Sequence, residues 1–174
     1  NLSMTSYTLH PAKPDDISLA ATLIARTYME LGAKMIEITG QLRGLPYMKD
    51  EYGVLVADAN KEAVGYALYT PVKVGETDRG AALLAPLAYD AGREDVDANK
   101  ILEDTLSYPK EKGFRYVLMH GDLETYEPLG FQDAEDMGIT SKVSYPNTIL
   151  LVKDLGEGAP EGISGQVEYP PFIS

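Results

Sequence analysis

The sequence contains no cysteine and no tryptophan, and only two of its 174 residues are histidines, His10 and His120. The absence of cysteine excludes disulfide bonds, a thiol nucleophile and cysteine-ligated metal sites. Two histidines are too few for a histidine-rich metal site, so we expect no metal. No Ser-His-Asp or Cys-His order stands out, and we therefore expect no nucleophilic side chain in any chemistry that the protein performs.

Long hydrophobic runs are lacking as well. No segment approaches the run of about 18 apolar residues that is typical of a transmembrane helix. The chain does not open with the basic and apolar regions of a secretory signal. These absences favour a cytoplasmic protein that has no membrane as a partner.

Basic residues are scarce relative to acidic ones. The chain has 15 Lys and Arg against 27 Asp and Glu, which gives a net charge of −12. Such a surface repels nucleic acid and anionic membranes, so we expect neither as a partner. It would attract a cationic substrate or partner, although the same charge also serves simply to keep a protein soluble.

The length is typical of one domain, and we expect residues 1–174 to form a single domain with an extended C-terminal tail from about residue 154. The patterns predict strands at 7–9, 53–58, 63–74, 81–89, 114–119, 130–135 and 147–152, and helices at 13–31, 33–44, 96–112 and 123–126. Strands flanked by helices in this order indicate an α/β or α+β fold with a mixed sheet.

Three prolines or glycines refine these elements, and one helix has a clear apolar face. Pro71 is expected to turn the far half of its strand into an edge or a bulge. Pro109 should loosen the end of the helix at 96–112, and Gly113 is expected to cap it. The predicted apolar face of the helix at 13–31 consists of Ile17, Ala20, Ala21, Ile24, Tyr28 and Leu31.

The segment from Pro86 to Leu106 runs from an apolar strand through a turn into a helix, which is the layout of a phosphate cradle. Six acidic residues and two basic ones lie between Asp90 and Asp104. One carboxylate about 4 Å from a phosphate opposes it by roughly 1 kcal/mol, whereas a helix N-terminus favours an anion by roughly 0.3–1 kcal/mol. The alternative is that Asp95 or Asp97 caps the helix instead.

Three motifs together resemble the GNAT superfamily of acyl-CoA-dependent N-acyltransferases, and most of all its small bacterial branch of predicted acetyltransferases. They are "YTLHPAKPDDISLAATLIARTY", "PLAYDAGREDVDANKIL" and "GFRYVLMHGDLETYEPLGF", and the tail "GISGQVEYPPF" is also similar to that branch. The resemblance covers nearly the whole chain. It implies a mixed, mostly antiparallel central sheet flanked by helices, with acetyl-CoA as co-substrate.

The resemblance also implies a cofactor loop, and it places five residues. Arg93 stands at the first position of the loop pattern, Val96 where the first glycine belongs, and Ala98 at the final small position. Leu87 and Tyr89 match the strand residues whose backbone groups pair with the pantetheine arm. Val96 departs from the pattern, because a β-branched residue poorly tolerates the positive φ that glycine permits. The loop is therefore expected to be degenerate.

Tyr126 begins "YEPLGF", which matches a family pattern of a tyrosine, any three residues and then Gly-Phe. This match implies that Tyr126 protonates the departing thiolate. A phenol is neutral and a proton donor at neutral pH, so it suits this role, but it could equally pack the short helix against the sheet. His120 ends a strand near the expected acceptor side and is a candidate general base, or a structural histidine beside a turn. Glu51 and Glu76 are further candidate bases.

Two hypotheses follow for function. The first is an N-acetyltransferase that transfers an acyl group from acetyl-CoA to an unidentified primary amine. The amine is either a small molecule or a peptide, and the acidic composition favours a cationic one. The alternative is a non-catalytic GNAT-fold module that binds a ligand or a protein and has lost CoA binding. The oligomeric state, a homodimer included, is left open.

Overall fold

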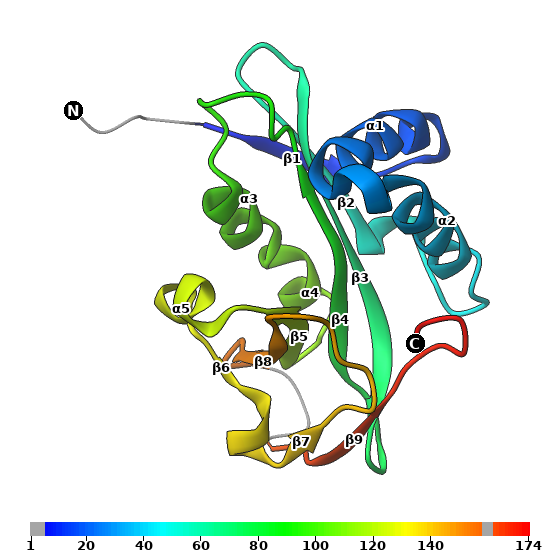
Figure 1. The fold of residues 1–174 in the computed structure, drawn as a ribbon, viewed down its shortest axis with the longest axis vertical. Helices are drawn as coiled ribbons and strands as arrows, with labels where there is room; N and C mark the ends of the chain where they lie inside the picture. The colour runs from blue at the N-terminus through cyan, green and yellow to red at the C-terminus, as the bar shows by residue number, and fades with distance from the viewer. Residues whose placement is uncertain (1–5, 158–161) are drawn as a thin grey trace. The chain divides into compact units, whose positions relative to one another are not determined.

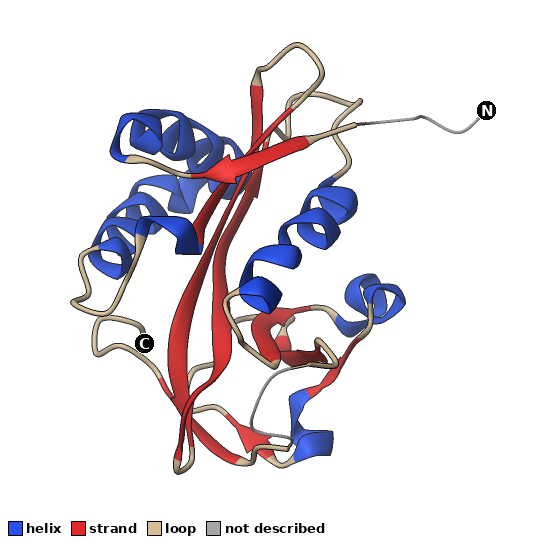
Figure 2. Ribbon diagram, turned by 180° about the vertical axis from the view of Figure 1, so that it is seen from behind, coloured by secondary structure: helices blue, strands red, loops and turns tan. Residues whose placement is uncertain are grey.

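The computed structural model describes residues 6–157 and 162–174. The fold is mixed α/β with a mostly antiparallel sheet flanked by helices, as predicted (Figures 1 and 2). Its contacts divide the chain into two compact units, Asn1–Leu68 with Ala85–Tyr108, and Tyr69–Leu84 with Pro109–Ser174. The predicted single domain and its tail include residues 1–5 and 158–161, which lie outside the described residues.

The first unit combines strands β1 and β2 and parts of β3 and β4 with the helices α1, α2 and α3. Strand β1 pairs with β2, and β2 pairs with the first part of β3. The elements of this unit are β1 (Thr8–Pro11), α1 (Ile17–Tyr28), α2 (Gly32–Arg43), β2 (Gly53–Ala57), the first part of β3 (Ala63–Val74), the last part of β4 (Thr77–Tyr89) and α3 (Ala98–Thr105). Short 3-10 turns lie at Pro14–Asp16, Met29–Leu31 and Asp50–Tyr52.

Two neighbouring residues of β3 show how the first unit is layered. Successive side chains of a strand point to opposite faces. On one face, a Cβ placed on Gly65 would lie only 2.8 Å from Ile101 of α3, so glycine is required for the close approach of that helix. On the other face, Arg43 of α2 donates to the Tyr66 hydroxyl at 3.2 Å. Helices therefore cover both faces of the first part of β3, as Figure 2 shows.

The second unit is built around β5 (Tyr116–Gly121) and β8 (Ile149–Asp154), which pair antiparallel along their whole length. Strand β6 pairs with β8, and β9 pairs with both β3 and the short β7. The remaining elements are α4 (Ser107–Glu111), which begins before the unit, α5 (Leu123–Tyr126), a 3-10 turn (Glu127–Leu129), β6 (Phe131–Asp133), a 3-10 turn (Ala134–Met137), β7 (Ile139–Thr140) and β9 (Gly165–Glu168).

The parallel pairing between β4 and β5 is short. It covers only Ala81–Leu83 on one strand and Tyr116–Leu118 on the other. Beyond this point β5 continues through His120 to Gly121 and keeps its pairing with β8. At the end of β5 the edge that no longer pairs with β4 can therefore contribute side chains and backbone groups to a binding site.

The helix predicted at 96–112 is in fact two helices. Helix α3 ends at Thr105, and α4 begins at Ser107. Pro109 explains the break, because a proline has no N–H for the carbonyl of residue i−4 and its ring clashes with that carbonyl, which here belongs to Thr105. Pro109 itself lies in the first turn of α4, where no donor is needed. Gly113 has a φ of +91° after α4, in agreement with the predicted cap.

The predicted apolar face of the first helix is only partly correct. Ala20 and Ile24 are buried as expected, together with Leu23, which was not predicted. Ile17 and Leu31 are 41% and 60% exposed. Met29 has a positive φ of 53°, which ends the regular helix and changes the phase of the residues that follow it.

The strand predictions needed smaller corrections. Strand β3 runs without interruption past Pro71, and β4 begins at Thr77 rather than at residue 81. The two strands are joined at Gly75 and Glu76, where Gly75 takes a φ of +57°. Strands β7 and β9 were not predicted, because both are short and their pairing is with distant segments. In the described ranges, no helix is both long and apolar enough to cross a membrane.

Candidate functional site

The predicted cofactor loop follows β4 in the first unit as two consecutive turns. The Arg93 N–H donates to the Asp90 carbonyl at 3.1 Å, and the Val96 N–H donates to the Arg93 carbonyl at 3.3 Å. The Asp97 N–H donates to the hydroxyl of Tyr7 at 2.9 Å. The loop is therefore a folded connection that leads directly into α3.

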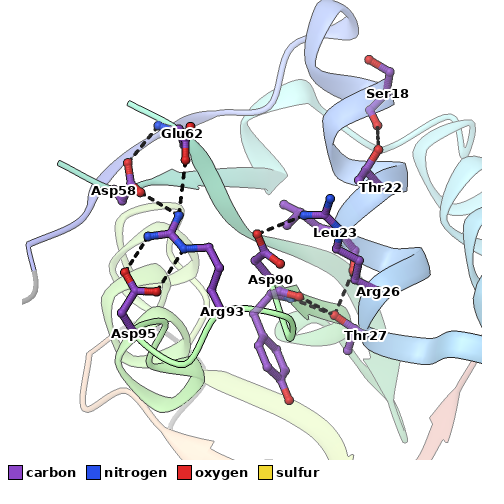
Figure 3. A network of polar contacts seen from close by, with 11 residues as sticks. Ser18, Thr22, Leu23, Arg26, Thr27, Asp58, Glu62, Asp90, Arg93 and Asp95 are labelled. Carbon is purple, nitrogen blue, oxygen red and sulfur yellow. Dashed lines mark hydrogen bonds and ion pairs between the residues drawn. The ribbon is translucent and has the colours of Figure 1, made fainter. Parts of the chain in front are cut away.

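Arg93 points its guanidinium at carboxylates from three positions (Figure 3). It lies 2.6 Å from Asp95, 2.8 Å from Asp58 and 3.5 Å from Glu62. Hydrogen bonds to Asp95 and Asp58 raise the pKa of Arg93, and the Arg93 side chain lowers the pKa of Asp95 in turn. The positive charge that a phosphate would use is thus already shared among acidic side chains.

The start of α3 retains two of the donors that a phosphate needs. The Asp97 side chain accepts from the Lys100 N–H at 3.1 Å, so Asp97 is the N-cap, as the alternative reading of the acids predicted. The Ile101 N–H donates to the Asp97 carbonyl. In the described part of the chain, the N–H groups of Ala98 and Asn99 have no acceptor, which is normal for a first helical turn.

Val96 is not strained. The non-glycine residues with positive φ in the described chain are Met29, Lys61 and Asn147. The expected conflict between Val96 and a left-handed backbone therefore does not arise, because this loop does not require the glycine conformation at that position. Val96 and Ala98 are both half-buried.

The end of β4 is held by α1 rather than left open (Figure 3). The Tyr89 N–H donates to Thr27 Oγ1 at 2.9 Å, and the same oxygen lies 2.9 Å from the Tyr89 carbonyl. Arg26 donates to Asp90 at 3.0 Å. Along the strand Leu87 and Tyr89 are half-exposed, whereas Ala88 and Asp90 between and after them are buried. Pairing of Leu87 and Tyr89 with a ligand remains a prediction.

In the second unit, Tyr126 packs closely over the end of β5. A Cβ placed on Gly121 would lie 2.9 Å from Cε2 of the Tyr126 ring, so glycine is needed there. The ring also meets Phe131 edge-on at a centroid distance of 6.2 Å. Asp122 accepts from the backbone N–H groups of Glu124 and Thr125 and so fixes the helix that carries Tyr126.

His120 lies in the same unit among polar and aromatic groups. Its Nε2 is 2.8 Å from the hydroxyl of Tyr169, whose oxygen is 2.6 Å from Ser141 Oγ. The ring of Tyr145 meets the imidazole edge-on at 5.0 Å. Burial lowers the pKa of His120 below its ordinary value, so the imidazole is neutral at neutral pH. His120 also lines a cavity of about 180 Å³.

Sequence reasoning missed the partners of these residues. Thr27 and Arg26 were assigned only to a helix, and Ser141 and Tyr169 were not singled out. Of the other candidate bases, Glu51 lies in the 3-10 turn before β2, and Glu76 is exposed in the turn between β3 and β4. Among the described residues, no group of histidine and carboxylate side chains could hold a metal ion.

This arrangement of strands and helices is the GNAT fold that the resemblance in the sequence implies, and comparison with solved structures confirms that fold. The crystal structure of the GNAT family N-acetyltransferase YhbS from Escherichia coli in complex with CoA matches 98% of this chain and 93% of that one, with a TM-score of 0.78 and 24% identity. A GNAT family acetyltransferase from Brucella melitensis in complex with acetyl-CoA matches 95% and 97%, with a TM-score of 0.72 and 18% identity.

The sequence comparison leads to the same group of proteins. The chain is similar to the uncharacterized N-acetyltransferase YhbS of Escherichia coli K12, with 28% identity over 118 residues, which are 67% of this chain and 71% of the relative. No family model matches the chain.

Proposed function

We propose that the protein is an N-acetyltransferase that transfers the acetyl group of acetyl-CoA to a primary amine. The observation that carries this proposal is the match of nearly the whole chain to the CoA complex of YhbS. The acetyl-CoA complex of the Brucella melitensis protein supports the same donor.

The loop of the first unit would bind the pyrophosphate of CoA through backbone rather than side chains. The free N–H groups of Ala98 and Asn99 are the donors, at the positive end of α3. Arg93 contributes little, because its guanidinium is engaged by Asp58, Asp95 and Glu62. We therefore propose modest affinity for CoA. Thr27 would have to give up the Tyr89 N–H if Tyr89 is to pair with the pantetheine arm.

The chemistry would be direct transfer with no acyl-protein intermediate. The amine nitrogen attacks the thioester carbonyl, the new C–N bond forms and the C–S bond breaks. His120 takes the proton that the amine loses, and the Tyr126 hydroxyl gives its proton to the departing sulfur. Backbone N–H groups at the end of β4 would stabilise the charge that develops on the carbonyl oxygen of the thioester. The net charge of −12 favours an amine that is positively charged in solution.

A screen of amines with acetyl-CoA tests the proposal. Thiol release is followed for each amine, with a reaction lacking amine as the control for simple hydrolysis, and mass spectrometry then detects the acetylated product. The proposal predicts amine-dependent release and a product heavier by one acetyl group. No amine-dependent thiol release for any amine would overturn it, and a lack of CoA binding in the same protein would favour the non-catalytic alternative.

A further inference from the structure

We propose that Tyr169 and Ser141 are positioning residues that keep the proton of His120 on Nε2. His120 Nδ1, with its lone pair, is then the atom that accepts the proton of the amine in the proposed reaction. The inference deepens the proposed function and rests on it for the role of His120 in catalysis. The state of the imidazole itself can be tested without any activity.

The three side chains form one chain of hydrogen bonds that starts at the end of β5. His120 Nε2 lies 2.8 Å from the Tyr169 hydroxyl, directly after β9. That hydroxyl lies 2.6 Å from Ser141 Oγ, directly after β7. Ser141 Oγ in turn lies 2.7 Å from the carbonyl oxygen of Val143 and 3.0 Å from its nitrogen.

The backbone of Val143 decides where each proton lies. A carbonyl oxygen only accepts, so the hydroxyl of Ser141 must donate to it. With its one proton used, Ser141 Oγ accepts from the hydroxyl of Tyr169 at their distance of 2.6 Å. The Tyr169 hydroxyl donates its hydrogen to Ser141, so its oxygen can only accept a hydrogen bond from His120. Nε2 must therefore carry the hydrogen.

The other ring nitrogen is left with an unused lone pair. His120 Nδ1 is buried and has no hydrogen-bond partner among the described residues. In a neutral imidazole one nitrogen donates and the other accepts, so an Nε2–H tautomer makes Nδ1 the basic atom.

The surroundings of the three hydrogen-bonded side chains keep His120 and Tyr169 neutral. Burial lowers the pKa of His120 and raises the pKa of Tyr169, and Tyr145 beside them also has a pKa raised by burial. The carboxylates of Asp133 and Glu135 line the same cavity as His120. A neutral base beside carboxylates suits an amine that arrives as a cation and must lose a proton.

Nitrogen NMR of protein labelled with ¹⁵N-histidine reads the tautomer directly. The chain has only two histidines, so a His10→Gln variant assigns the two imidazoles. In the unmodified protein at neutral pH we expect a proton bonded to Nε2 of His120 and none on Nδ1. A proton on Nδ1 overturns the inference, whether or not the protein transfers acetyl groups.

Variants test the positioning role. Tyr169→Phe and Ser141→Ala should each let the Nε2 proton exchange faster or populate the second tautomer, and Ser141→Thr should restore the original spectrum. Tyr145→Phe keeps the ring beside His120 and removes a hydroxyl that is not part of this series of hydrogen bonds. The tautomer of His120 should therefore not change in this variant. Unchanged spectra in both Tyr169→Phe and Ser141→Ala would overturn the inference.

Kinetics connect the tautomer with the reaction. Tyr169→Phe should lower kcat about 10- to 100-fold, a part of what a general base typically supplies, with the KM for acetyl-CoA unchanged. An altered spectrum with unaltered kcat would contradict the role of His120 as base. If no amine is acetylated but the expected tautomer is found, the proposed function fails and the hydrogen-bond chain stands.

Discussion

Arg93 is the cation of the predicted cofactor loop, and its charge is divided among carboxylates of which Asp95 is the nearest. Asp95→Asn should release part of that charge toward a phosphate. One carboxylate is worth about 1 kcal/mol near an anion in water-like surroundings, so CoA should bind up to about fivefold more tightly. Calorimetric titration measures the change.

Asp104→Asn is the matched control for this variant, since it removes the same charge from a carboxylate that pairs with Lys100 instead of Arg93. We expect a smaller gain in affinity from the control. Equal gains would show that the net charge of the region, and not the engagement of Arg93, limits CoA binding.

Tyr126 is the proposed acid for the departing thiolate. Tyr126→Phe keeps the ring over Gly121 and removes the proton donor, so turnover should fall about 10- to 1000-fold while CoA affinity stays the same. Steady-state kinetics and a CoA titration give the two quantities. Tyr47→Phe is a suitable control, because Tyr47 is 44% exposed in the first unit. Unchanged turnover would leave Tyr126 as a packing residue.

His120 should make stability depend on pH in a defined direction. Burial lowers its pKa in the folded protein below the ordinary value of about 6.5, so the unfolded chain takes up the proton first as the pH falls. The contribution of His120 to the free energy of unfolding is thus fully present above that value and is lost as the pH falls toward the folded pKa.

Urea unfolding of the unmodified protein and of His120→Gln at a series of pH values checks this direction. The difference in unfolding free energy between the two should shift in favour of the variant as the pH drops below about 6.5. A difference that is constant with pH would mean that the imidazole is not held neutral by burial.

Helix α3 depends on its cap, and the cap also carries a charge. Asp97→Asn keeps a side-chain oxygen for the Lys100 N–H and removes the negative charge. Asp97→Ala removes both and should cost about 1 kcal/mol of stability. Thermal unfolding should therefore separate the two variants, while both should bind CoA more tightly than the unmodified protein. Equal melting temperatures for the two variants would contradict the capping role.

Elements with strong local patterns could be predicted from the sequence. The apolar run of β2 (Gly53–Ala57) is buried throughout, and α1 buries Ala20 and Ile24 as its periodicity indicated. The break between α3 and α4 could have been placed from Pro109 alone, since a proline has no N–H to continue a helix and its ring clashes with the carbonyl four residues before it.

The contacts that shape the candidate site could not be predicted in this way. Thr27 bonds Tyr89 across 62 positions of the chain, and His120 meets Tyr169 across 49. Such pairs depend on how distant elements pack and leave no mark on local hydrophobic periodicity. The acids near Arg93 were visible in the sequence, but which of them cap, pair or remain free depended on their three-dimensional positions.

The molecule as a whole carries a net charge of −12, which repels CoA, itself an anion. Salt screens repulsion between exposed charges, so raising the ionic strength should strengthen CoA binding. A site that held the pyrophosphate mainly with free arginine and lysine side chains would respond in the opposite direction.

Calorimetric titration of CoA into the unmodified protein, at low and at high salt, tests the central claim most directly. An N-acetyltransferase with this loop should bind one CoA per chain with a Kd below about 100 μM, and more tightly at high salt. The absence of any heat at millimolar CoA, with the protein still folded at both salt concentrations, would contradict it.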